Sequence, residues 1–119
     1  AAQPAPAATR AAASDRSISA RDLAALLVEA TAPVLLDVRE PHEFEIAALP
    51  GAVLIPLGEL PARIGELDPG EPTVVYCHLG VRSATALTHL EAAGFADARH
   101  LTGGLDAWSR TVDPSLPRY

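Results

Sequence analysis

The sequence predicts an α/β domain with a central, mostly parallel sheet and helices on both faces. Three features predict it: short continuous apolar runs rich in β-branched residues, stretches of helical period, and regular alternation of the two along the chain. Continuous apolar runs are typical of parallel strands, which are buried on both faces. Strands that alternate with helices form parallel sheets, because each crossover helix returns the chain to the same end of the sheet.

The start of the chain differs in composition from the rest. Residues 1–16, AAQPAPAATRAAASDR, contain alanine, proline and polar residues but no large apolar side chain. Such a segment cannot bury enough surface to offset its ordering entropy, so we expect a flexible linker here. A secretory signal is the alternative, but a basic start and an apolar middle are missing. We therefore predict one folded domain over residues 17–119, with a further domain upstream of the linker in the parent protein.

The first predicted helix lies within residues 17–30, where Ser19 is suited to cap its N-terminus. Its apolar face would comprise Leu23, Leu26, Leu27 and Ala30. The elements that follow are a strand at 33–38, a weakly helical loop at 40–49, a strand at 51–56, a short helix at 57–67, a strand at 72–77, a helix at 83–94, a strand at 97–101 and a last helix at 103–110.

The helix predicted at 83–94 would bury Ala86, Leu87, Leu90 and Ala93 on one face, and Gly94 would end it.

Composition excludes several classes of function. The net charge of -6 argues against a nucleic acid as the main partner, because phosphate binding needs a basic patch. A single cysteine excludes an internal disulfide, and three of the histidines, His42, His89 and His100, are too scattered to predict a metal site. No apolar run is long enough to span a bilayer, so we expect no membrane partner and a cytoplasmic location.

The one cysteine, Cys77, ends the strand at 72–77, and the loop from Cys77 to Arg82 reads CHLGVR. A helix N-terminus carries unpaired N–H groups and a partial positive charge, so it favours the thiolate, which is the reactive form of cysteine. Gly80 lets the turn fold tightly, and Arg82 adds a permanent cation. We therefore predict a cradle for an anion attached to, or attacked by, sulfur. The alternative is that Cys77 is a small buried hydrophobe at the end of a core strand.

This loop resembles the C-x-x-G-x-R active-site loop of the rhodanese-domain sulfurtransferases. LLDVREPHEFEIAALPGAVLIPL, at 35–57, resembles the family signature that precedes the loop, and GFADARHLTGGLDAW, at 94–108, resembles the one that follows it. The resemblance covers residues 17–119 and implies a rhodanese-like sheet. One departure is Ala48-Leu49, where the family often has His-Ile; we expect it to change packing or the mouth of the site.

The resemblance implies that Cys77 accepts a sulfane sulfur as a persulfide and passes it to a nucleophile, with no cofactor beyond this covalent intermediate and no metal. The backbone amides that would line the persulfide cradle are those of His78, Leu79, Gly80, Val81 and Arg82. Arg82 would both attract the anion and brace the loop. The loop has four residues between Cys77 and Arg82, one fewer than in the related phosphatases and arsenate reductases, which favours sulfur over phosphate.

Asp37 and Arg39, at the end of the neighbouring strand, are possible supporting residues. For Asp37 we favour a structural ion pair that fixes the loops at this edge, and Arg39 would help to recruit an anionic donor. For His78 we favour a side chain that faces solvent and tunes substrate choice over a general base. For Trp108, with Gly103 and Gly104, we expect core packing around a tight turn.

The linker and the tail VDPSLPRY, at 112–119, resemble the C-terminal rhodanese domain of the fused adenylyltransferase–sulfurtransferases of the molybdopterin-synthase-sulfurylase type. This implies two partners, an upstream adenylyltransferase domain and a ubiquitin-like sulfur carrier protein that receives the sulfur at its adenylated C-terminus. Molybdenum cofactor biosynthesis is one pathway that such carriers serve. The sulfur donor would be thiosulfate or a cysteine desulfurase. Because Cys77 is the only cysteine of the chain, a thiol from elsewhere must resolve the acyl disulfide.

Other functions remain open at this point. A free-standing thiosulfate sulfurtransferase would use the same cradle but would need no linker. A non-catalytic adaptor module is disfavoured by the presence of both Cys77 and Arg82, and a phosphatase is disfavoured by the loop length. A redox-sensing thiol is the remaining alternative.

Overall fold

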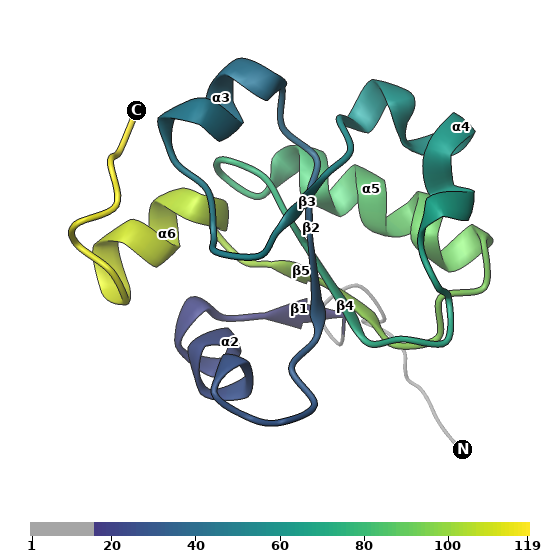
Figure 1. Cartoon of the computed structure of the whole chain (residues 1–119), viewed down its shortest axis with the longest axis horizontal. Coiled ribbons are helices and arrows are strands. Elements are labelled where there is room, and N and C mark those ends of the chain that lie inside the picture. Colours follow the sequence, from purple (N-terminus) through teal and green to yellow (C-terminus); the bar gives the residue numbers. More distant parts are fainter. Residues whose placement is uncertain (1–15) are drawn as a thin grey trace.

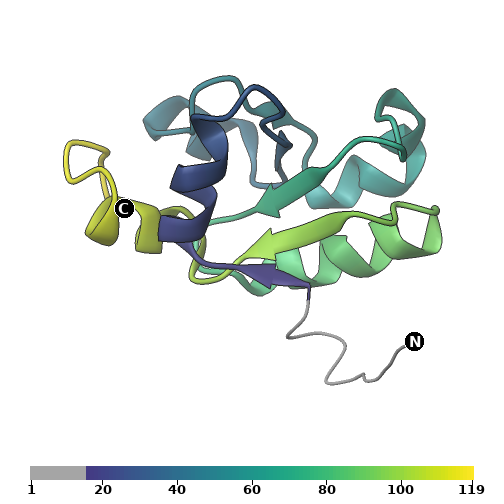
Figure 2. The same cartoon turned by 90° about the horizontal axis from the view of Figure 1, so that it is seen from below.

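A five-stranded parallel sheet lies at the centre of the computed structural model, which describes residues 16–119 (Figure 1). Its strands are β1 (Ser17–Ile18), β2 (Val34–Asp37), β3 (Val53–Leu54), β4 (Thr73–Tyr76) and β5 (Ala98–Leu101). They are ordered β1-β5-β4-β2-β3, and each neighbouring pair is parallel. Figure 2 shows β1, β5 and β4 side by side. Except for Arg16, the predicted linker lies outside the described residues.

Helices cover both faces of the sheet, which confirms the predicted fold class (Figure 1). On one face, α2 (Ala20–Leu27) and α6 (Gly104–Thr111) contribute Leu23, Leu105 and Trp108 to the core. On the other face, α4 (Leu60–Arg63) and α5 (Val81–Ala92) pack on the strands; the buried apolar residues they contribute are Leu60, Ala86, Leu87 and Leu90. The remaining elements are α3 (Pro41–Ile46) and the 3₁₀ turns η1 (Leu57–Glu59) and η2 (Ile64–Glu66).

The helix boundaries differ from the prediction, most clearly in α2 and α5. Ser19 caps α2 as predicted, because its side chain accepts a hydrogen bond from the Asp22 N–H at 3.1 Å, but the helix ends at Leu27 and leaves Ala30 exposed. Helix α5 begins at Val81, two residues earlier than predicted, and ends at Ala92.

Two residues beyond the end of α5 also differ from the prediction. The predicted burial of Ala93 is wrong, because Ala93 follows the last helical residue and is exposed. Phe95 fills the core there instead: its N–H donates to the Leu90 carbonyl at 3.1 Å, and its side chain is buried.

Three segments differ in kind or extent. The loop predicted at 40–49 contains the six-residue helix α3, which begins with Pro41 in its first turn and has a capping box between Glu40 and Glu43. The strand predicted at 51–56 is regular only over Val53–Leu54. Strand β1 is an element that the sequence did not predict; it pairs with β5 through the register Ser17 to His100.

The topology brings three loops to the carboxyl end of the sheet. Cys77 follows β4 directly, and Val38 and Arg39 follow β2, whose Asp37 is in register with Tyr76. The chain after β5 turns at Gly103 into α6. Ligands of parallel α/β sheets bind at this end, so a functional site is expected among these three loops.

Candidate active site

Cys77 is buried, with 1% of its surface exposed, and its sulfur is surrounded by hydrogen-bond donors. Sγ accepts the backbone N–H of Gly80 at 3.1 Å and that of Ser83 at 3.3 Å. A cavity of about 120 Å³ lies over this sulfur, and the residues that line it are Cys77, His78, Leu79, Val81 and Arg82. The loop predicted from CHLGVR is thus assembled around Cys77, and its second amide contact comes from Ser83, one residue beyond the predicted loop.

Gly80 sets the direction of the loop. Its φ is +104°, in the left-handed region, and it is the N-cap residue of α5. A Cβ at this position would lie 3.3 Å from the backbone nitrogen of Gly103, so the turn is also tightly packed against the segment that follows β5. Glycine therefore allows α5 to begin immediately beside the sulfur, where the N–H groups of the N-cap residue Gly80 and of Ser83 donate to Sγ.

The first turn of α6 holds the loop from the other side. The Leu105 N–H donates to the carbonyl oxygen of Cys77 at 2.8 Å, and the Asp106 N–H donates to that of His78 at 3.0 Å. Gly104 permits this contact, because a Cβ on it would lie 2.5 Å from both carbonyl oxygens. Trp108 is buried in the core as predicted, but Gly104 also has a role in the site that the sequence analysis missed.

Arg82 is paired with a carboxylate that the sequence analysis did not identify. Its Nη1 and Nη2 donate to Oε1 and Oε2 of Glu43, on α3, at 2.6 and 2.9 Å. The hydrogen bonds from Arg82 hold the pKa of Glu43 well below its ordinary value, and the same contact raises the pKa of Arg82. This bidentate pair ties α3 to the cysteine loop, so the geometry shows how Arg82 braces the loop.

Asp37 and Arg39 form a buried ion pair. Both side chains have 0% exposure, and Arg39 Nη2 lies 2.6 Å from Asp37 Oδ2. Nη2 of Arg39 also donates to the carbonyl of Ala47 at 2.6 Å. Burial alone lowers the pKa of Arg39, but the hydrogen bonds to Asp37 and Tyr119 outweigh it and raise that pKa. Asp37 is therefore in the structural ion pair that we favoured, whereas Arg39 has no exposed surface with which to recruit an anionic donor.

Tyr119 links these groups at the edge of the site. Its hydroxyl accepts a hydrogen bond from Arg39 Nη1 at 2.7 Å and donates to Glu43 Oε2 at 2.8 Å. Burial is the main cause that raises the pKa of Tyr119 to about 12. The Tyr119 ring is stacked on that of His78, with centroids 3.9 Å apart and planes 9° apart. The half-buried His78 ring is thus held against Tyr119, and no hydrogen bond from it to Cys77 is present among residues 16–119.

A second unforeseen group lies on the buried side of the sulfur. The Cys77 thiol is 3.6 Å from Ser83 Oγ, and this hydroxyl is 3.3 Å from Nδ1 of His100 on β5. Ser83 could have been identified as a site residue from the sequence, because it directly follows Arg82 at the end of the loop. His100 had no local signal, because only the packing of α5 on β5 brings it to Ser83.

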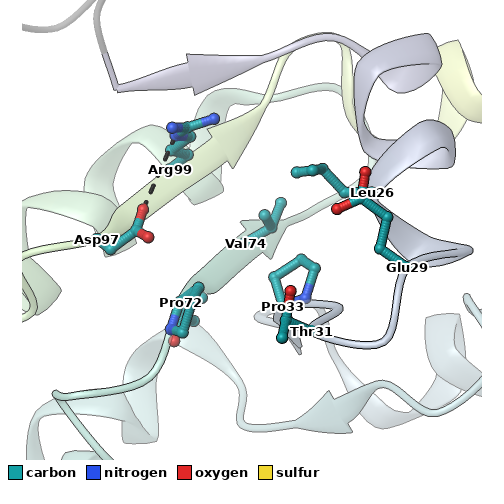
Figure 3. A pocket seen from close by; sticks show the side chains of 9 residues that line it. Leu26, Glu29, Thr31, Pro33, Pro72, Val74, Asp97 and Arg99 are labelled. Carbon is teal, nitrogen blue, oxygen red and sulfur yellow. Dashed lines mark ion pairs between the residues drawn. The ribbon is translucent and has the colours of Figure 1, made fainter.

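A larger cavity, of about 240 Å³, lies at the opposite end of the strands (Figure 3). Pro33, Pro72 and Asp97, which precede β2, β4 and β5, line it together with Leu26, Glu29, Thr31, Thr73, Val74 and Arg99. It contains no cysteine or histidine, and Arg99 is paired with Asp97 at 4.0 Å (Figure 3). The small cavity at Cys77 is therefore the candidate active site, although it has half the volume.

The described part of the chain has neither a metal site nor a membrane-spanning helix. Over residues 16–119, no three side chains of histidine, cysteine, aspartate or glutamate are placed to hold a metal ion. Over the same residues, no helix has the length and apolar character needed to cross a membrane.

Buried sulfur held by loop amides at the carboxyl end of a parallel sheet is typical of domains that transfer groups through a cysteine. Comparison with known proteins specifies the class. The family described as "Rhodanese-like domain" matches residues 19–111, and the chain belongs to this family. It is a rhodanese-type domain homologous to sulfurtransferases, as the loop motif indicated.

Relatives and solved structures extend this result. The chain is 43% identical over 89 residues to a rhodanese-like/PpiC domain-containing protein 12, chloroplastic, of Arabidopsis thaliana, covering 71% of this chain and 30% of that protein. It is 39% identical over 110 residues to the probable adenylyltransferase/sulfurtransferase MoeZ of Mycobacterium tuberculosis, covering 91% of this chain and 28% of that protein. The crystal structure of a rhodanese-related protein from Thermoplasma volcanium is 32% identical, with a TM-score of 0.75, and the match covers 82% of this chain and 93% of that one.

The chain thus spans less than a third of the length of these two curated relatives.

Proposed function

We propose that this domain is an active sulfurtransferase and that Cys77 carries the transferred sulfur as a persulfide. The observation that carries the proposal is the pair of backbone N–H groups, from Gly80 and Ser83, that converge on Sγ at 3.1 and 3.3 Å. Donors fixed in this way stabilise negative charge on sulfur without having to reorganise during the reaction.

The proposed reaction has two steps at one sulfur. The Cys77 thiolate attacks the sulfane sulfur of a donor, an S–S bond forms, and the donor leaves with the electron pair of its broken bond; with thiosulfate the product is sulfite. The terminal sulfur of the persulfide then carries the negative charge, next to a cavity of about 120 Å³. When an acceptor takes this terminal sulfur, the S–S bond breaks and the thiolate of Cys77 is restored.

For the acceptor, we propose the adenylated C-terminus of a ubiquitin-like sulfur carrier protein. The relative from Mycobacterium tuberculosis, whose name includes both adenylyltransferase and sulfurtransferase, supports this choice because it aligns with 91% of this chain. The tail through Tyr119 also supports it, since its tyrosine contacts Glu43 and His78 at the site.

In this reaction the terminal persulfide sulfur attacks the acyl-adenylate, displaces AMP and leaves an acyl disulfide on Cys77. A thiol supplied by another protein or a small molecule then attacks Sγ, so that the carrier leaves as a thiocarboxylate and Cys77 is held in a mixed disulfide. A second thiol reduces this disulfide and restores the Cys77 thiolate. An adenylyltransferase domain joined through the predicted linker at 1–16 would raise the effective concentration of the acyl-adenylate. This reaction needs no resident cofactor, and we place it in the cytoplasm and in molybdenum cofactor biosynthesis as parts of the same proposal.

The test compares two acceptors with the same domain. One reaction contains thiosulfate and cyanide; the other contains a cysteine desulfurase, cysteine, a reductant, ATP, a separate adenylyltransferase domain and a carrier that ends in Gly-Gly. We expect thiocarboxylate to form on the carrier with the wild-type domain but not with Cys77→Ala. Thiocyanate formation without thiocarboxylate would support the free-standing thiosulfate enzyme instead. Failure of both reactions would contradict the proposal and favour a non-catalytic module.

A further inference from the structure

Three polar side chains form a line that leads from the sulfur away from the cavity. Cys77 Sγ lies 3.6 Å from Ser83 Oγ, and Ser83 Oγ lies 3.3 Å from His100 Nδ1. The Ser83 hydroxyl has a second acceptor at the same distance, the carbonyl oxygen of Gly80. Cys77 and Ser83 have 1% and 0% of their surface exposed, whereas His100 is only half-buried. His100 does not line the cavity over Cys77. The line therefore joins a buried thiol to a half-buried imidazole that lies outside the lining of the cavity.

The sheet explains how His100 reaches this position. His100 is in register with Val75 of β4, two residues before Cys77. Side chains alternate between the faces of a strand, so His100 shares a face with Ala98, which is buried in the same core cluster as Cys77. Helix α5 covers this face and presents Ser83 in its first turn. The contact thus depends on three elements, β4, β5 and α5.

The charged groups around His100 are paired elsewhere. Arg16, just before β1, is 3.4 Å from Glu91 of α5, and on β5 itself Arg99 is 4.0 Å from Asp97. The other titratable groups of α5 are Arg82, which binds Glu43, and His89. Burial lowers the pKa of His100, so its ring is mainly neutral near pH 7 and has one nitrogen free to accept a proton.

We propose that Ser83 and His100 form a proton relay for Cys77. The thiol donates its proton to Ser83 Oγ, the hydroxyl passes its own proton to His100 Nδ1, and the imidazole releases the proton of Nε2 to solvent. One proton leaves the protein and no electron is transferred. Nδ1–H then donates to Ser83 Oγ, which turns its O–H toward the sulfur. The thiolate thereby has three donors: the N–H groups of Gly80 and Ser83 and the Ser83 hydroxyl.

The relay deepens the proposed function and rests on it for its use, because sulfur loading begins from the thiolate. Its test does not depend on sulfur transfer. Cys77 is the only cysteine of the chain, so the rate of alkylation by iodoacetamide, followed by intact mass, reports on this thiol alone. The rate is measured from acid to alkaline pH for the wild type, His100→Ala, Ser83→Ala and Ser83→Thr. His89→Ala, which removes a histidine of α5 outside the relay, is the matched control.

We expect His100→Ala to move the midpoint of the alkylation profile upward by about one pH unit, because without Nδ1–H of His100 the Ser83 hydroxyl donates to the Gly80 carbonyl and not to the sulfur. Below both midpoints this shift slows alkylation about tenfold, since the thiolate fraction falls tenfold per unit. At alkaline pH the rates converge. Ser83→Ala is expected to shift the midpoint at least as far, Ser83→Thr to retain most of the wild-type profile because it keeps the hydroxyl, and His89→Ala to match the wild type.

Three results would overturn the relay. One is a His100→Ala profile that coincides with that of His89→Ala. Another is a rate that falls equally at every pH, which would indicate a purely structural role. The third is a shift with Ser83→Ala but none with His100→Ala, which would leave Ser83 as a simple donor. If Ser83→Ala fails to fold, the alkylation profiles of His100→Ala and Ser83→Thr still test the relay. If the alkylation profiles agree with the relay but no persulfide forms on Cys77, then the proposed sulfur transfer is wrong and the relay is not.

Discussion

Replacement of Gly104 by alanine tests how the cysteine loop is held in place. An alanine Cβ at this position would lie 2.5 Å from the carbonyl oxygens of Cys77 and His78 and 2.6 Å from the carbonyl carbon of His78. The atoms in the way are backbone and cannot rotate aside as a side chain does. The N-terminus of α6 must therefore move off the loop, and the hydrogen bonds from Leu105 and Asp106 to these carbonyls, 2.8 and 3.0 Å long, are lost or stretched.

The expected loss of stability has two parts. Gly104 has a φ of +61°, where a residue with a Cβ costs about 1–2 kcal/mol. Each backbone hydrogen bond that is lost adds about 1 kcal/mol. We therefore expect Gly104→Ala to lower the free energy of unfolding by about 3–4 kcal/mol, a large effect for one methyl group. Gly51→Ala is the matched control: its φ is +79°, but nothing lies within 4 Å of its Cβ, so only the conformational cost of about 1–2 kcal/mol applies.

Urea unfolding followed by circular dichroism gives both free energies, and iodoacetamide alkylation reports on the loop. We expect Gly104→Ala to be less stable than Gly51→Ala by about 2 kcal/mol and to change the alkylation rate of Cys77, which Gly51→Ala leaves alone. Equal free energies of unfolding and equal alkylation rates for the two variants would refute the reasoning that α6 holds the loop.

Three further outcomes are expected at the polar network beside the loop. Folding lowers the pKa of Glu43, so its ionised carboxylate stabilises the fold fully at pH values above the unfolded-state pKa of about 4.3. This stabilisation is lost as the pH falls through the folded-state pKa of Glu43. Glu43→Gln should therefore cost about 2 kcal/mol at pH 7 and flatten the acid dependence of unfolding in urea; an unchanged acid dependence would argue against the pair. Tyr119→Phe keeps the stack on His78 but loses two hydrogen bonds, so we expect a loss of about 1–2 kcal/mol by thermal unfolding; a more stable variant would contradict this. Arg82→Lys cannot reproduce the bidentate contact, and we expect sulfur transfer to slow about tenfold; wild-type kinetics would show that the second contact is dispensable.

The elements that the sequence predicts well are those whose signal is local. The apolar runs of β2 and β4 and the helical period of α5 each lie within a few consecutive residues, and all three elements are present. Strand β1 has only two residues, so no period can reveal it; it exists because Ser17 and Ile18 pair with β5, far along the chain. The early end of α2 has no comparable signal, since Ala30 fits the apolar stripe equally well.

The same distinction applies to the site. Cys77, Gly80 and Arg82 were predicted because they share one short loop, and the roles assigned to their amides and charge remain to be tested by experiment. Glu43 lies 39 residues from Arg82 and 76 from Tyr119, so only the folded chain brings these three together. Ser83 was missed for a different reason. The predicted helix began at Ser83, whereas α5 begins at Val81, which places Ser83 within its first turn and its N–H beside the sulfur.

Intact-mass spectrometry of the domain after exposure to a sulfur donor tests the central claim most directly. The wild type and Cys77→Ala are each incubated with thiosulfate and, separately, with a cysteine desulfurase and cysteine, and are then freed of the donor. We expect the wild type to gain the mass of one sulfur atom with at least one donor, the gain to disappear on reduction, and Cys77→Ala to gain nothing. No gain with either donor, or an equal gain in Cys77→Ala, would contradict a persulfide on Cys77.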